Sequence, residues 1–467
     1  MEPATRILSE FVIGRSAIEL PDDLWVLSKQ YLLDTIGAMV IGSGKPWAEI
    51  VSGFSAGVGG TTGGPSTIVA FPTKTLPQMA AFANGNMGHG FEIDDVHDES
   101  LTHPGVAVVP AALAVAEEAH SSGEELLLSI VMGYELISRV GLGVGSVSHM
   151  LGGFYPTGTN GVFGAAAAAG RLLKLTAEQL THAMGTAGSF ASGIVEYSVS
   201  GGMVKRLHAG RAAEGGVTAA YLARNGFTGP TTVLEGKFGY CRTFSRAPDL
   251  PRLLENLGSE YKIRQITVKP YFCCSDIHPV IDALLDIKRE NKVLAADVEH
   301  ILVESTTKLF ELNYIPGHTS MMAAQYSVPF TAALVLTRDI KDPAIYDEGI
   351  LQEAVLQALQ HKVEMRATRE FDALYPRTIA ARVTITLQNG KKLVATNRGA
   401  TGSIHKPMCK ADIEEKFMRL ADPILPAGNA AKVLRLVDDI KEAPDIHPVM
   451  ALLRFERGHV SKQLAAE

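Results

Sequence analysis

The chain has 467 residues and 46% hydrophobic content, which is enough for a large buried core and for two or three domains. Its formal net charge is −7 and no basic stripe is present to neutralise phosphates, so nucleic acid is not expected as a partner. The N-terminal segment has no apolar core of signal-peptide length, and no run of about 18 uninterrupted apolar residues occurs. We therefore expect a cytoplasmic protein without membrane contact, whose partners are small molecules and a second copy of itself.

Helical periodicity dominates both ends of the chain. Apolar residues recur every three or four positions up to about residue 265, for example in residues 124–141, and again after residue 402. Between these parts the period changes to that of strands. We therefore predict a mainly α protein, in which residues 1–265 and 403–467 form one large all-helical domain and residues 266–402 form a smaller inserted α+β domain.

The predicted strands lie in the inserted domain or at its border. Residues 261–271 are typical of a strand entering a turn, and residues 300–306 of a second strand. Residues 381–397 alternate apolar and polar side chains around Asn389-Gly390, which predicts a hairpin with a two-residue turn.

The densest group of ionisable side chains lies in residues 88–105, between two apolar segments that are predicted to be helices. Acids and bases set among buried helices usually mark a functional site, although a solvated acidic turn is the alternative. The group comprises Glu92, Asp94, Asp95, Asp98 and Glu99 with His89, His97 and His103.

Two further segments favour anion binding. In residues 201–216, a helix would place Lys205 and His208 on one face, and Gly210 would let another backbone or a ligand approach. A solvated basic face is the alternative. In residues 152–164, a Tyr-Pro turn precedes an alanine-rich helix, whose first backbone N–H groups attract anions.

The inserted domain offers weaker signals. His278-Pro279 opens a predicted helix, and His278 can simply cap it. The four cysteines are too few and too poorly spaced for a disulfide framework or a zinc site. The adjacent pair Cys273 and Cys274 either lines a pocket or fills buried space.

Six motifs follow one another along the chain: EIDDVHDESLTHPG, FYPTGTNGVFGAAAAAGRLL, GGMVKRLHAGRAA, KPYFCCSDIHP, AAQYSVPF and PMCKADIEEKF. In this order they resemble the motifs of the MmgE/PrpD family, and the resemblance spans nearly the whole chain. This family includes 2-methylcitrate dehydratases, cis-aconitate decarboxylases and iminodisuccinate epimerases.

The resemblance implies a homodimer, a helical domain built from both chain ends, and an α+β lid domain. It also implies a site between the domains that handles small di- and tricarboxylates without a metal or an organic cofactor. We assign catalytic roles to Asp94, His103, Tyr155 and Lys205. Substrate contacts are expected from Glu92, Asp95, His97, Arg206, His208, Lys269, Cys274 and His278.

One position departs from the family pattern. Many members carry a histidine where this chain has Tyr155, and in the decarboxylases that histidine is an active-site residue. A tyrosine can donate a proton or, if Lys205 lowers its pKa, accept one. The substitution therefore weakens the expectation of a decarboxylase more than that of the family.

The chemistry common to the family is proton transfer at carbon next to a carboxylate. Lys205, Arg206 and protonated histidines are expected to stabilise the dianion that forms. Loss of water would define a dehydratase, loss of CO₂ a decarboxylase, and return of the proton on the opposite face an epimerase. We predict a lyase of the dehydratase or decarboxylase type, with an epimerase of an iminodisuccinate-like substrate as the alternative.

Two other classes compete with this reading. His97-Asp98 is an HD dipeptide, which suggests a metal phosphohydrolase, but such a site needs an upstream histidine on a separate helix and His89 is only eight residues away. A non-catalytic helical scaffold is the second competitor. Binding of small polycarboxylates would raise the melting temperature and argue against a scaffold.

Overall fold

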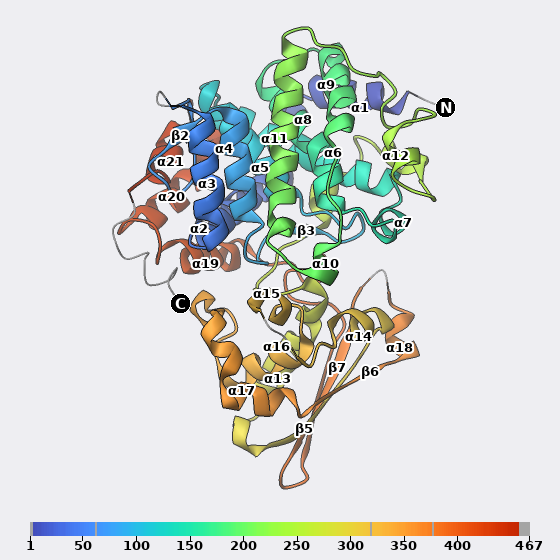
Figure 1. Cartoon of the computed structure of the whole chain (residues 1–467), viewed down its shortest axis with the longest axis vertical. Coiled ribbons are helices and arrows are strands. Elements are labelled where there is room, and N and C mark those ends of the chain that lie inside the picture. The colour runs from blue at the N-terminus through green and yellow to red at the C-terminus, as the bar shows by residue number, and fades with distance from the viewer. Residues whose placement is uncertain (1–2, 61–62, 318–319, 376–377, 457–467) are drawn as a thin grey trace. The chain divides into compact units, whose positions relative to one another are not determined.

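The computed structural model describes residues 3–60, 63–317, 320–375 and 378–456. The chain divides into two compact units. The first comprises Met1–Thr267 with Lys410–Ala466, and the second comprises Val268–Cys409 (Figure 1). The sequence pattern placed these limits after residues 265 and 402.

The first unit is built almost entirely of helices, which confirms the prediction of a mainly α fold. Its helices are α1 (Ala4–Gly14), α2 (Asp22–Ser43), α3 (Pro46–Val58), α4 (Pro77–Gly88), α5 (Pro104–Glu118), α6 (Gly123–Gly143), α7 (Ser146–Leu151), α8 (Pro156–Leu172), α9 (Ala177–Phe190), α10 (Tyr197–Ser200), α11 (Val204–Arg224), α12 (Tyr240–Thr243), α19 (Lys410–Ala421), α20 (Asn429–Asp438) and α21 (His447–Leu452).

Short antiparallel strand pairs interrupt this helical unit. Strand β1 (Ser66–Thr67) pairs with β2 (Lys74–Thr75), and β3 (Val96–His97) pairs with β4 (Ile266–Thr267). The strand predicted over residues 261–271 is therefore reduced to β4, because a 3-10 turn occupies Lys262–Gln265.

Helices α4, α5, α8 and α11 pack against one another and hold the site. Small residues make this possible: a Cβ atom on Gly85 of α4 would lie 2.8 Å from the Cα of Gly210 of α11. The alanine run of α8 is fully buried. Helix α6 alone, among the described residues, is long and apolar enough to cross a membrane by length and composition, but it lies wholly buried as a core helix.

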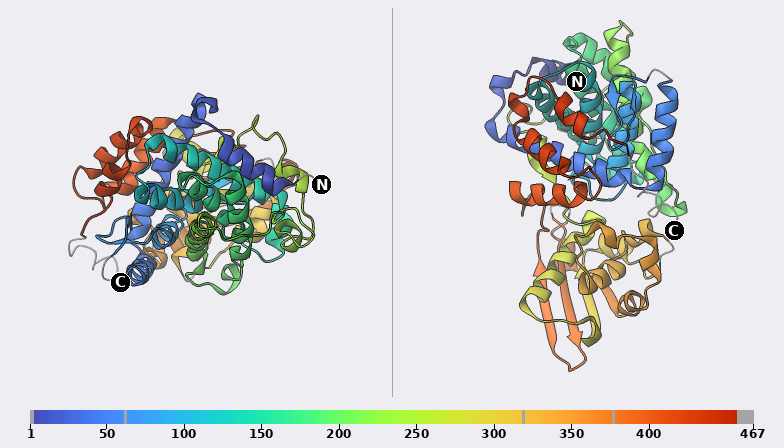
Figure 2. Two further views of the ribbon diagram at one scale, coloured as in Figure 1. Left: turned by 90° about the horizontal axis from the view of Figure 1, so that it is seen from above. Right: turned by 90° about the vertical axis from the view of Figure 1, so that its left-hand side faces the viewer.

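The C-terminal helices complete the first unit. Helix α19 packs on α2, and α20 packs on α2 and α21. In both views of Figure 2 the C-terminal helices, in red, therefore lie beside N-terminal helices, in blue. Lys416 of α19 reaches Asp34 of α2 at 2.5 Å and donates a hydrogen bond to the backbone oxygen of Ile93 at 2.8 Å. Helix α19 thereby supports the loop within residues 88–105, whose group of ionisable side chains is called the acidic cluster below.

The second unit combines a four-stranded sheet with helices. The strands are β5 (Val298–Ser305), β6 (Val363–Ala367), β7 (Ala381–Leu387) and β8 (Lys392–Asn397), and the helices are α13 (His278–Glu290), α14 (Thr307–Asn313), α15 (Met321–Ala324), α16 (Val328–Thr337), α17 (Ala354–Gln360) and α18 (Arg369–Asp372). The sheet has the order β6-β5-β7-β8, with β5 and β6 parallel and the other pairs antiparallel. Helix α13 packs on β7 and β8.

The hairpin of β7 and β8 is present, but its turn differs from the prediction. Leu387 donates to the oxygen of Lys391, and Gly390 donates to the oxygen of Leu387. Gly390 has φ +80°, whereas Asn389 is not in the left-handed region. The loop is therefore a three-residue turn with a bulge at Gly390, because a two-residue turn of the predicted type needs positive φ at both central residues.

Candidate active site

Three helix starts and one loop bring the candidate residues together. His103 precedes α5, Tyr155 precedes α8, and Lys205 lies in the first turn of α11. The backbone N–H of His103 donates to Thr157 Oγ1 at 3.1 Å, and the rings of Tyr155 and His208 lie 5.2 Å apart. Backbone N–H groups at helix starts carry partial positive charge, so this region favours anions.

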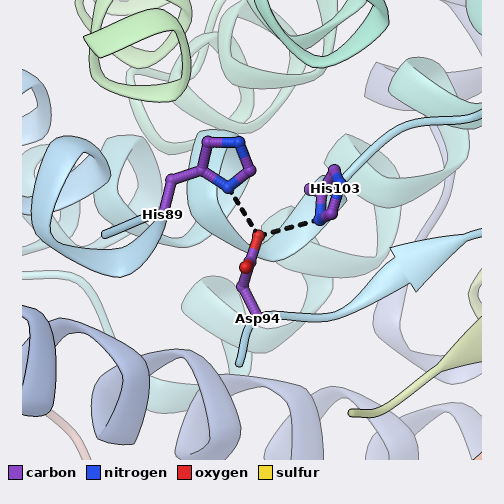
Figure 3. Close-up of side chains that lie close together, drawn as sticks. All are labelled: His89, Asp94 and His103. Carbon is purple, nitrogen blue, oxygen red and sulfur yellow. Dashed lines mark hydrogen bonds and ion pairs between the residues drawn. The ribbon is translucent and has the colours of Figure 1, made fainter. Parts of the chain in front are cut away.

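At the centre of the region, Asp94 lies between two histidines (Figure 3). Its Oδ2 atom accepts a hydrogen bond from His89 Nδ1 at 2.7 Å and lies at an ion-pair distance of 2.9 Å from His103 Nδ1. His89 and Asp94 are buried, whereas 14% of the His103 side chain is exposed. His103 is therefore the member of this group that a ligand reaches most easily.

His89 extends the group to Tyr155. Its Nε2 atom lies 2.6 Å from the Tyr155 hydroxyl. Burial lowers the pKa of His89 to about 4, although Asp94 opposes the shift, so the ring is neutral near pH 7. With Nδ1–H donated to the Asp94 carboxylate, Nε2 accepts the hydroxyl proton of Tyr155. The result is a chain of carboxylate, imidazole and hydroxyl like the one that activates nucleophiles in hydrolases.

The pKa of Tyr155 decides between the two roles left open for it. Burial, and to a lesser extent the neighbours Tyr197 and Glu92, raise the pKa of Tyr155 well above its usual value. The condition under which Tyr155 would accept a proton, a pKa lowered by Lys205, is therefore not met. Tyr155 is a neutral donor whose proton can leave only toward a base such as His89.

The cations of the site are Lys205 and Arg206. Lys205 forms a buried ion pair with Glu92, whose backbone is in the left-handed region at φ +56°. The Arg206 guanidinium lies 3.9 Å above the Trp47 ring, and its Nε donates to the oxygen of Gly90 at 3.3 Å. Both positive charges thus lie next to the loop that carries the acidic cluster.

His208 does not add to this positive charge. Burial, and then the charge of Lys205, lower the pKa of His208 to about 4. Because burial also lowers the pKa of His89 to about 4, neither His89 nor His208 supplies positive charge near pH 7. His208 lies one turn after Lys205 on α11, as predicted, with its ring against Tyr155 and Tyr197.

Asp95 is buried and its carboxylate is held by groups of the protein, so its substrate contact stays a prediction. Its Oδ1 accepts from the backbone N–H of Gly105 at 2.8 Å, and its Oδ2 accepts from the Tyr134 hydroxyl at 2.6 Å. Burial raises the pKa of Asp95 to about 7. Because Gly105 belongs to the first turn of α5, Asp95 fixes the helix start that carries His103.

The substrate contact of His97 stays a prediction as well, because the ring is occupied within the protein. His97 is fully buried in β3, with Nε2 at 3.1 Å from Gln265 Oε1 and Nδ1 accepting from the backbone N–H of Ser100 at 3.2 Å. Protein groups therefore use both ring nitrogens. Its neighbour Asp98 accepts from the Thr267 hydroxyl at 2.5 Å, so the HD dipeptide joins β3 to β4 instead of forming a phosphohydrolase centre.

Within the described part of the chain, two groups of side chains have the donor spacing of a metal site: His89, Asp94 and His103, and His120, Asp445 and His447. Neither group contains the HD dipeptide. The first group belongs to the candidate active site, where hydrogen bonds and ion pairs account for its geometry.

Lys269, Cys274 and His278 lie in the second unit, and their substrate contacts remain predictions. Lys269 and His278 are buried, and the ring of His278 packs edge-on against Tyr271 at 5.2 Å. His278 is the first residue of α13, while Ile277 occupies the capping position. Burial, reinforced by Asp276, raises the pKa of the Cys274 thiol to about 12, so Cys274 is not a thiolate near pH 7.

Three side chains that shape the site, His89, Tyr134 and Trp47, were not assigned a role from the sequence. His89 was visible in the acidic cluster, but its link to Tyr155 was not. Tyr134 lies 39 residues from its partner Asp95. Trp47 carries no motif of its own, and only its position under Arg206 reveals its role.

Comparison with known proteins agrees with the motif pattern. The MmgE/PrpD N-terminal domain matches residues 6–253, and the MmgE/PrpD C-terminal domain matches residues 271–442. A cis-aconitate decarboxylase of Aspergillus terreus is 26% identical over 458 residues, which cover 93% of this chain and 92% of the relative. The cis-aconitate decarboxylase of Homo sapiens is 26% identical over 471 residues, which cover 97% of this chain and 95% of the relative. The chain therefore belongs to the MmgE/PrpD family of enzymes.

Proposed function

We propose that this protein is a cofactor-independent lyase that transfers a proton at carbon next to a carboxylate of a small di- or tricarboxylate. The relatives named cis-aconitate decarboxylase support the lyase class. The observation that carries the proposal is the sharing of one carboxylate, Asp94, by two imidazoles, one of which leads to Tyr155. Lys205 and Arg206 supply positive charge beside this group.

Substrate recognition rests on charge. An ammonium group donates up to three hydrogen bonds, so Lys205 can serve Glu92 and a substrate carboxylate together. The starts of α5, α8 and α11 add the partial positive charge of their backbone N–H groups. Two or three carboxylates on a small carbon skeleton match this arrangement better than a single carboxylate does.

Proton removal is assigned to His103, the more exposed of the two imidazoles. With Nδ1 facing Asp94, its Nε2 is the atom that takes the proton, and the Asp94 charge stabilises the imidazolium that forms. The electron pair left on carbon spreads into the neighbouring carboxylate, and the resulting dianion is stabilised by Lys205.

Tyr155 and His89 form a second pair of groups that can exchange a proton with substrate. The Tyr155 hydroxyl takes a proton from substrate as it passes its own to His89 Nε2, and the reverse movement returns a proton to substrate. One carboxylate compensates one positive charge, and the charge of His103 disfavours protonation of His89. His103 and His89 therefore take up an extra proton in turn, so that one is protonated while the other is neutral.

An epimerase also requires two such groups, one to remove the proton and one to return it on the opposite face. Epimerisation of an iminodisuccinate-like dicarboxylate is therefore the second candidate. Since Tyr155 stands where decarboxylases carry a histidine, we expect loss of water to exceed loss of CO₂. A cytoplasmic location, a homodimer and a lid role for the second unit remain predictions from the sequence.

The test is incubation in D₂O with 2-methylcitrate, cis-aconitate, citrate and iminodisuccinate separately, followed by NMR. Water loss from a tricarboxylate would support the lyase, and deuterium entry without loss of a group would support the epimerase. Absence of every reaction, when the same preparation is folded and binds none of the four compounds, would refute both.

A further inference from the structure

The second group of metal-ligand side chains lies at the other end of α5 from His103. His120 follows α5, whereas Asp445 and His447 precede and begin α21. The Nδ1 atoms of both histidines face the same carboxylate, at 3.2 Å from Asp445 Oδ2 and 2.5 Å from Asp445 Oδ1. The two rings stack with centroids 4.5 Å apart and planes inclined by 18°.

The backbone holds these side chains in place. Gly123 donates to the oxygen of Ala443 at 2.9 Å, and a side chain on Gly123 would overlap the oxygen of Ile440, so the two segments meet backbone to backbone. His447 N–H donates to Asp445 Oδ1 at 2.8 Å, which fixes the carboxylate.

The backbone of His120 is unusual as well. It ends α5 in the left-handed region at φ +50°, where Ser121 donates back to the oxygen of Ala116. Glycine is the usual residue at this helix-ending position, because a side chain there costs energy. A histidine at such a position, with its ring against a second histidine and a carboxylate, favours a role for the side chain.

We propose that His120, Asp445 and His447 form a binding site for a divalent transition metal of the Zn²⁺ type. Two imidazole nitrogens and one carboxylate oxygen suit Zn²⁺, Ni²⁺ or Co²⁺ rather than Mg²⁺ or Ca²⁺. The three ligand atoms all lie within 4.8 Å of one another. Tetrahedral Zn²⁺ places neighbouring ligands roughly 3.3 Å apart, so small side-chain rotations suffice.

The exposure of the group fits an ion that exchanges with solvent. The His120 side chain is 71% exposed, and those of Asp445 and His447 are 35% and 34% exposed, which leaves room for water to complete the coordination shell.

Bound metal would join the α5–α6 connection to the C-terminal helices. The site is therefore a structural clamp, which stabilises the first unit and takes no part in the reaction. This inference does not depend on the proposed lyase activity.

The experiment uses full-length enzyme dialysed against EDTA and then freed of chelator. Calorimetric titration with Zn²⁺ near pH 7.5 should show one equivalent bound, with a rise in melting temperature. His120→Gln and His447→Gln should each weaken binding by about a hundredfold or more. His361→Gln, at an exposed histidine of the second unit, is the matched control and should bind as the unmodified enzyme does.

Binding by the unmodified enzyme should also weaken as the pH falls, because protons compete with the metal for its ligands, and this arm needs no variant. Absence of binding up to about 1 mM Zn²⁺, a Kd that corresponds to about 4 kcal/mol, would overturn the proposal. Binding that survives both glutamine variants but is lost in His103→Gln would overturn it too, because the ion would then occupy the candidate active site.

Discussion

Removal of one oxygen atom tests the role of Tyr155. In Tyr155→Phe the ring keeps its neighbours Tyr197 and His208, at centroid distances of 5.5 Å and 5.2 Å. The hydrogen bond of 2.6 Å to His89 is lost, and His89 Nε2 is left buried without this donor. We expect a loss of about 1–3 kcal/mol in the free energy of unfolding.

The effect on kcat is measured separately from this loss of stability. If Tyr155 carries a proton, kcat should fall by more than about a hundredfold, which is about 2.7 kcal/mol in the activation barrier. The assay is turnover of whichever substrate the NMR experiment identifies, normalised to folded enzyme by urea unfolding. We also expect weak or no decarboxylation of cis-aconitate by the unmodified enzyme.

Tyr240→Phe is the matched control for this variant. The Tyr240 hydroxyl is buried and donates to Asn160 Oδ1 at 2.8 Å, outside the candidate site residues. It should lose similar stability but keep its kcat. A near-normal kcat in Tyr155→Phe would show that the ring only fills space, and equal loss of kcat in both variants would show that the rate reports stability. Strong CO₂ release from cis-aconitate would refute the reading of Tyr155 as a barrier to decarboxylation.

Four further predictions follow from the site. Lys205→Ala should keep the fold and reduce kcat by more than its effect on binding, about 3 kcal/mol or more in the barrier, and a kcat above about a tenth of the unmodified value would contradict this. His103→Asn should change stability by no more than about 1 kcal/mol but lower kcat/KM by about a hundredfold or more, whereas a collapse in stability with normal activity per folded molecule would mark a structural role. Activity should survive exhaustive EDTA dialysis, and recovery only on adding Mg²⁺, Mn²⁺ or Fe²⁺ would favour a metal enzyme. Because burial lowers the pKa of His89, His97 and His208 to about 4, from 6.5, these three groups bind more protons in the unfolded chain than in the folded enzyme between these values. Their contribution to stability should therefore be lost as pH falls through this range, whereas Asp95, whose pKa is raised to about 7, contributes with the opposite sign. Urea midpoints measure the dependence, and His97→Gln should flatten the part that the histidines contribute.

Several features of the fold were readable from the chain alone. The change of hydrophobic period near residue 266 predicted an α+β insertion between helical segments, because period is a local property of the sequence. The acidic cluster and the basic start of residues 201–216 were visible because their residues are close in sequence. Strand β6 was missed, since five residues without a flanking turn signal do not stand out.

The roles of individual side chains were decided by tertiary structure. Sequence marked Asp95 and His97 as substrate contacts, but Tyr134 and Gln265, which use their polar atoms, come from distant segments.

The protonation states of the site residues were also decided by tertiary structure. The sequence shows that Tyr155 and Lys205 belong to neighbouring motifs, but it cannot show how far burial moves a pKa. Burial leaves His89 and His208 neutral and holds Tyr155 as a donor, and those states decide which groups can move a proton. The sequence by itself therefore determined the family, the helical architecture and the residue types of the site, whereas only the packing of distant segments, through desolvation and hydrogen-bond partners, decided what each residue can do.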